Sequence, residues 1–226
     1  MKRQAIEKLY EWKNSAGRKP LIIRGARQVG KTWLMKEFGR LAFKNIVYIN
    51  FDSNSDIAQL FAGNLDIPRL ISGLEIFSRS KIVPQETLLI FDEVQEAPRA
   101  LTSLKYFCEE ASEYAIVAAG SLLGVAMHQG TSFPVGKVNF LDLYPMSFTE
   151  FLNATGNEQL TELLQKGDWQ LITGLKDRFI DLLRLYYYIG GMPEAVQCYL
   201  DEKDVFKVRE VQKRILDAYE QDFSKH

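Results

Sequence analysis

Residues 25–32 read G-A-R-Q-V-G-K-T, and their types and spacing are those of a loop that binds phosphate. Glycines let the backbone curl so that its N–H groups converge on phosphate oxygens, at the positive end of the following helix. The ammonium of Lys31 adds a mobile charge toward the outer phosphates, and the hydroxyl of Thr32 is placed to ligate Mg²⁺. We therefore expect a nucleotide to bind along Gly25, Ala26, Arg27, Gln28, Val29, Gly30, Lys31, Thr32 and Trp33.

Two carboxylates, Asp92 and Glu93, follow the apolar segment TLLIF at residues 87–91. Ligands of open α/β sheets bind outside the carboxyl ends of the strands, so both acids should face the phosphate loop. Asp92 would hold Mg²⁺ directly or through a water. Glu93, one position further, would polarise an attacking water as a general base. A solvated acidic strand end is the structural alternative, and the phosphate loop upstream favours the catalytic interpretation.

A third candidate, Ser121, follows the apolar segment YAIVAA at residues 114–119. If this segment is a strand between the other two, the Ser121 hydroxyl would lie beside the third phosphate and the attacking water. It would then act as a catalytic sensor of that phosphate. The alternative is the ordinary start of a loop.

These residues require a parallel sheet to position them. Short apolar segments alternate with segments of helical periodicity, which predicts βαβ units with helices on both faces of the sheet. The expected strands are 21–24, 45–51, 87–91, 114–119 and 138–143, and the expected helices are 5–13, 31–38, 55–63, 67–80 and 98–112. After residue 145 we expect only helices, at 147–154, 160–166, 169–188 and 204–223.

The composition excludes several other classes of protein. The 226 residues carry 28 Lys+Arg and 29 Asp+Glu, so a dedicated polyanion-binding domain, which is usually strongly basic, is not indicated. Two cysteines and two histidines are too few for a zinc cluster or a disulfide framework. No apolar run reaches the roughly 18 residues of a membrane span, and the charged start is unlike a signal peptide. We expect a cytoplasmic protein that does not bind membranes.

Five motifs in this order, RGARQVGKT, LLIFDEVQ, AAGS, LYPMSFTEF and GGMPEA, resemble a bacterial and archaeal group of AAA+ superfamily ATPases. The resemblance extends over residues 6–223. It implies a P-loop NTPase α/β three-layer sandwich of the type with an additional catalytic glutamate, followed by a helical lid. The implied divisions are an N-terminal helix at 1–16 that packs on the core, an ATPase core at 17–145 and a lid region at 146–226. Relatives usually continue into a C-terminal domain of unassigned function, which we expect this sequence to lack.

The motifs together predict ATP binding and hydrolysis with Mg²⁺. Lys31, the metal and the loop amides would neutralise charge on the transferred phosphoryl group. Hydrolysis would drive a switch or motor that acts on a protein partner, or that works as a homo-oligomer. The alternatives are a small-molecule kinase, a nucleotide-gated interaction module with negligible turnover, and a DNA-associated motor. The near-zero net charge does not favour the last of these.

Overall fold

The computed structural model describes residues 1–120 and 134–223, which divide into two compact units. The sheet unit comprises Ala5–Ala26 and Lys31–Leu143. The C-terminal unit comprises Met1–Gln4, Arg27–Gly30 and the chain from Tyr144 onward. Four of the eight phosphate-loop residues therefore group with the C-terminal unit, whereas the helix that begins at Lys31 belongs to the sheet unit.

The sheet unit is built on five parallel strands in the order β2-β3-β4-β1-β5. The strands are β1 (Leu21–Arg24), β2 (Asn45–Asn50), β3 (Thr87–Asp92), β4 (Ala115–Ala119) and β5 (Asn139–Asp142). All five predicted strands are confirmed, and no observed end differs from its predicted end by more than one residue. Because the strands are parallel, the chain leaves β1 and β3 at the same edge of the sheet. β4 lies between β1 and β3, as the expectation for Ser121 required, but Ser121 itself lies outside the described residues.

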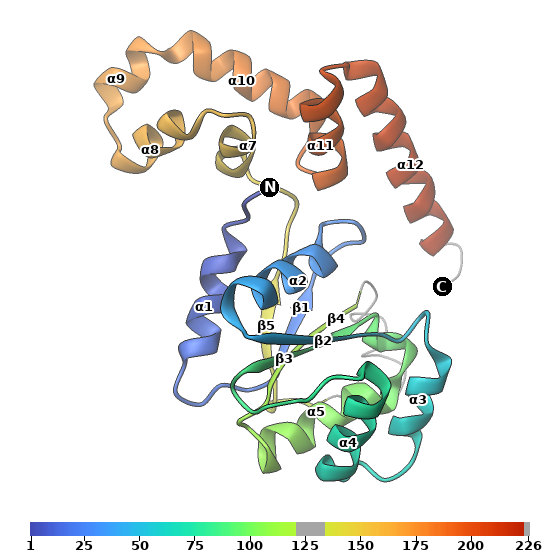
Figure 1. Cartoon of the computed structure of the whole chain (residues 1–226). Helices are drawn as coiled ribbons and strands as arrows, with labels where there is room; N and C mark the ends of the chain where they lie inside the picture. The colour runs from blue at the N-terminus through green and yellow to red at the C-terminus, as the bar shows by residue number, and fades with distance from the viewer. Residues whose placement is uncertain (121–133, 224–226) are drawn as a thin grey trace. The chain divides into compact units, whose positions relative to one another are not determined.

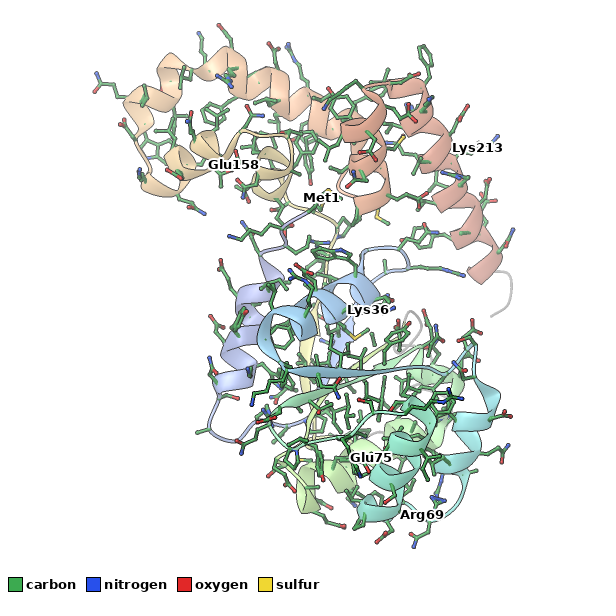
Figure 2. All side chains as sticks on the ribbon, viewed as in Figure 1. Met1, Lys36, Arg69, Glu75, Glu158 and Lys213 are labelled. Atoms are coloured by element: carbon green, nitrogen blue, oxygen red, sulfur yellow. The ribbon has the colours of Figure 1, made fainter. Side chains whose placement is uncertain are left out.

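Helices cover both faces of this sheet, which confirms the three-layer α/β sandwich (Figure 1). Helices α1 (Ala5–Asn14) and α2 (Lys31–Ala42) pack on one face, and α3 (Ser55–Ala62), α4 (Ile67–Ser78) and α5 (Pro98–Glu110) pack on the other. Apolar side chains fill the space between the sheet and α3–α5 (Figure 2). The core on that face includes strand residues that alternate with those of the opposite face, such as Ile22, Ile49, Phe91 and Ile116. α2 runs four residues beyond its predicted end at residue 38.

The C-terminal unit is helical, and no described residue after Asp142 forms a strand. Its helices are α7 (Phe148–Ala154), α8 (Glu158–Lys166), α9 (Trp169–Gly174), α10 (Lys176–Ile189), α11 (Pro193–Glu202) and α12 (Val205–Phe223). The helix expected at 169–188 is two helices, because the chain turns after Gly174 at Leu175. α11 was not predicted as a separate helix, although Pro193 at its first turn is a typical start signal. None of the described helices has both the length and the apolar composition needed to cross a bilayer.

Two of the motifs that distinguish the sequence meet inside the C-terminal unit. The N–H of Met146 donates to the Gly191 carbonyl at 2.6 Å, and the Tyr186 hydroxyl donates to the Met146 carbonyl at 2.8 Å. A Cβ on Gly191 would overlap the Met146 carbonyl, and Gly190 has a left-handed φ of 78°. The GGMPE turn therefore needs both glycines so that it can approach the segment before α7 closely.

Replacing Gly191 with alanine should destabilise the C-terminal unit by about 1–3 kcal/mol, because the new Cβ must displace backbone atoms of Met146. Chemical denaturation followed by circular dichroism measures the loss. Gly174→Ala is the matched control, since a Cβ there would meet no atom within 4 Å. Equal stability of the two variants would contradict the close approach.

Candidate functional site

The phosphate-loop motif connects β1 to α2. Gln28 and Gly30 have left-handed φ values of 64° and 92°, which turn successive N–H groups toward a common side. α2 begins at Lys31 and is 12 residues long, so its positive end lies where the loop ends. The loop and helix start have the backbone features of an anion-binding site.

Lys31 is nearly buried, with 7% of its surface exposed. Its Nζ donates to the carbonyl oxygens of Gly25 and Ala26, at 2.9 Å each. These bonds fold the side chain back over the start of the loop. Burying an ammonium away from water costs free energy, so the charge of Lys31 favours the presence of an anion nearby.

Thr32 and Asp92 are joined directly. The Thr32 hydroxyl donates to Asp92 Oδ2 at 2.6 Å, and the Glu93 N–H donates to Asp92 Oδ1 at 3.2 Å. Asp92 is buried at the end of β3. The sheet order and the start of α2 thus bring together the hydroxyl and carboxylate that the sequence assigned to a metal.

A second hydroxyl, that of Tyr48, also donates to Asp92 Oδ2, at 3.0 Å. Partial burial, followed by the charge of Asp92, raises the pKa of the Tyr48 phenol to about 12. Lys36 Nζ lies 3.7 Å from the centre of the Tyr48 ring. Tyr48 was not among the site residues predicted from the sequence. Its place two residues before the end of β2, the strand beside β3, was the available signal.

Glu93 has an unusual backbone conformation for a side-chain-bearing residue, with φ 50° and ψ 46°. Strained positions of this kind cluster at functional sites. Its Oε2 accepts a hydrogen bond from Gln95 Nε2 at 2.7 Å. Gln95 Oε1 is buried and accepts no hydrogen bond from the described residues. Gln95 is a second residue at the site that was not predicted from the sequence.

The oxygen atoms of Thr32 and Asp92 at this edge of the sheet suit a hard cation only if the cation also binds further ligands. Among the described residues there is no cluster of three His, Cys, Asp or Glu side chains able to hold a metal by themselves. Thr32 and Asp92 offer oxygen ligands, and Mg²⁺ typically binds one or two such groups and takes the rest from water and phosphate. The residues present therefore fit Mg²⁺ that arrives with a nucleotide.

The predicted site residues do not all belong to one unit. Gly25, Ala26, Lys31, Thr32, Asp92 and Glu93 belong to the sheet unit, and Arg27, Gln28, Val29 and Gly30 belong to the C-terminal unit. Trp33, on the first turn of α2, is 43% exposed. Ser121 cannot be placed because it lies outside the described residues.

Comparison with known families and structures identifies the fold. A family described as AAA domain matches residues 17–152, and a domain of unknown function (DUF8612) matches residues 180–226. No curated protein matches the chain. The five-stranded parallel sheet with flanking helices is that of AAA+ P-loop ATPases.

Several solved structures are similar to the chain. The Walker-type ATPase PABY2304 of Pyrococcus abyssi has a TM-score of 0.59 at 15% identity, over 99% of this chain and 75% of that one. ORC of Drosophila, solved bound to DNA, has a TM-score of 0.51 at 16% identity, over 98% of this chain and 66% of that one. AMPPCP-bound DnaA from Aquifex aeolicus has a TM-score of 0.47 at 16% identity, over 88% and 59%. The chain thus spans between 59% and 75% of the length of these three structures.

Tyr48→Phe should remove one phenol that titrates at about pH 12 from the ultraviolet absorbance of the folded protein. The neutral phenol stabilises the fold fully below its unfolded pKa of about 10, and this contribution is lost as the pH rises through about 12. In denaturant, the difference in ultraviolet absorbance between wild type and variant should titrate with a midpoint near pH 10. A folded-state midpoint near 10 would contradict the Tyr48–Asp92 contact.

Proposed function

The chain belongs to the AAA domain family, and on this premise we propose that it binds ATP together with Mg²⁺ and hydrolyses the ATP. The observation that carries the proposal is the 2.6 Å hydrogen bond between Thr32 Oγ1 and Asp92 Oδ2. It joins the end of the phosphate loop to the acid at the end of β3. A chance loop motif would not bring its last residue to a buried carboxylate from another strand.

Phosphate binding would use the loop amides from Gly25 to Gly30 and the first turn of α2, Lys31 to Trp33. Lys31 Nζ would exchange its bonds to the Gly25 and Ala26 carbonyls for phosphate oxygens. This exchange replaces neutral acceptors with charged ones, and hydrogen bonds between charged partners are the stronger class. Thr32 and Asp92 would hold Mg²⁺, which when bound neutralises charge on the outer phosphates.

For hydrolysis, Glu93 would orient a water for attack on the γ-phosphorus and accept a proton from it. A bond forms between the water oxygen and phosphorus as the bond to the β–γ bridging oxygen breaks. The products are ADP and inorganic phosphate. Lys31 and the loop amides would stabilise charge that develops during transfer. Ser121 remains our candidate for the sensor of the third phosphate.

ATP turnover would drive a conformational change in this chain that acts on a partner, and the comparisons do not identify that partner. A protein or a second copy of the chain is the partner we propose. The near-neutral charge of the chain gives no support to nucleic acid as the general partner. The DNA in the Drosophila ORC structure is bound by that protein, and this chain spans only 66% of the length of the ORC chain.

A nucleotide-gated module with negligible turnover is the second candidate. The hydrogen bond from Gln95 Nε2 to Glu93 Oε2 favours it, because the bond engages the carboxylate that would otherwise accept a proton from water. In such a module, ATP binding would change the interaction with a partner, and phosphate release would be absent.

Lys31→Ala should weaken ATP binding by about 10- to 100-fold, through loss of a charge-assisted hydrogen bond to phosphate. A titration with a fluorescent ATP analogue measures the affinity, and circular dichroism confirms that the variant is folded. Lys44→Ala is the control, because Lys44 is exposed and pairs with Glu86 at the start of β2. Unchanged nucleotide affinity in Lys31→Ala would overturn the site assignment.

Glu93→Gln should keep ATP affinity while phosphate release falls by about 100-fold or more, the usual contribution of a general base. Phosphate release from ATP, with no acceptor added, is the assay. Activity equal to that of the wild type would remove Glu93 from the mechanism. Negligible release by the wild-type protein as well would favour the nucleotide-gated module.

A further inference from the structure

The phosphate-loop residues Arg27–Gly30 group with the C-terminal unit, and two of their carbonyls are hydrogen-bonded within that unit. The Arg27 carbonyl accepts from the Tyr219 hydroxyl of α12 at 2.7 Å. The Val29 carbonyl accepts from Arg3 Nη1 at 2.9 Å. The donors come from opposite ends of the chain, and neither belongs to the nucleotide-binding motifs.

Arg3 is held rigidly by the elements around it. It is 5% exposed, and its Nε pairs with Glu150 Oε1 at 3.1 Å. Its Nη2 donates to the Tyr144 carbonyl at 2.6 Å. Glu150 also closes the capping box at the start of α7 with Ser147. The guanidinium therefore reaches Val29 from a fixed position, and only a planar fork can make these three bonds together.

These bonds determine the direction of the loop N–H groups. In a trans peptide the C=O and the following N–H lie in one plane and point in opposite directions. A donor on the Arg27 carbonyl therefore orients the N–H of Gln28, and a donor on the Val29 carbonyl orients the N–H of Gly30. Both N–H groups are among those that would bind phosphate.

We propose that Arg3 and Tyr219 are positioning residues that preorganise the phosphate loop, so that nucleotide binding and the docking of α12 on the loop stabilise each other. This inference rests on the proposed ATP site. Coupling between two binding events is reciprocal, so ATP must strengthen the α12 contact by the factor by which that contact strengthens ATP binding. The nucleotide state is thereby communicated to α12, which belongs to the segment matched by the domain of unknown function.

The direct test is Tyr219→Phe, which removes one hydroxyl and keeps the ring. We expect the affinities for both MgATP and MgADP to fall by about 5-fold, the effect of one hydrogen bond. Both nucleotides are affected because Gln28 and Gly30 would bind phosphates that ATP and ADP have in common. In steady-state ATPase assays KM should rise while kcat stays unchanged, since this contact acts equally in the ground and transition states.

Tyr187→Phe is the matched control on the same unit. Tyr187 is 74% exposed, and none of the described residues hydrogen-bonds to its hydroxyl. Its nucleotide affinity and KM should equal those of the wild type. If Tyr219→Phe also binds MgATP with wild-type affinity, the positioning role is wrong, although the proposed ATP site stands. If the wild-type protein binds no MgATP, the proposed function fails and this inference fails with it.

A second measurement does not depend on any variant. Hydrogen exchange of the wild-type protein should slow across α12 when MgATP or MgADP is added, and Tyr219→Phe should lose most of this protection. Exchange in α12 that is unchanged by a nucleotide bound to the wild type would overturn the proposal. Slower exchange in α12 of wild type and variant alike would remove Tyr219 from the coupling.

Discussion

The site depends on one constraint, that β1 and β3 end at the same edge of a parallel sheet with β4 between them. This order brings the start of α2, which follows β1, to the carboxyl end of β3. The Thr32–Asp92 hydrogen bond is the local consequence, and Tyr48 adds a second donor because β2 ends beside β3. Separating the two strand ends would leave a phosphate loop without a metal acid.

The C-terminal motifs acquire a physical role through the contacts they make inside their own unit. Glu150 in the segment LYPMSFTEF completes the capping box of α7 and accepts a hydrogen bond from Arg3. In the GGMPE turn, the Gly191 carbonyl accepts a hydrogen bond from the Met146 N–H. Arg3 and Tyr219 in turn hold carbonyls of the phosphate loop. Through Arg3, Glu150 is therefore linked to a loop carbonyl that is distant from it in sequence.

The sequence was sufficient to predict the sheet and its flanking helices, because buried strands have strong local signatures. The phosphate-loop motif was sufficient to propose site residues, and the structure places two of them, Thr32 and Asp92, in a hydrogen bond. Tyr48 and Gln95 were missed because their roles arise from strand pairing and side-chain direction, which a single sequence does not display. The break at Leu175 was missed because the apolar periodicity continues across Gly174. The grouping of Arg3 and Tyr219 with the loop is a tertiary effect with no local signal.

The proposed function requires that the backbone amides of the loop, together with Lys31 and a coordinated Mg²⁺, bind a triphosphate. Isothermal calorimetry of the wild-type protein titrated with ATP, with and without Mg²⁺, tests it most directly. We expect saturable heat with one ATP per chain, and tighter binding when Mg²⁺ is present. A folded protein that releases no heat with magnesium–ATP, across the concentrations at which P-loop proteins saturate, would contradict it.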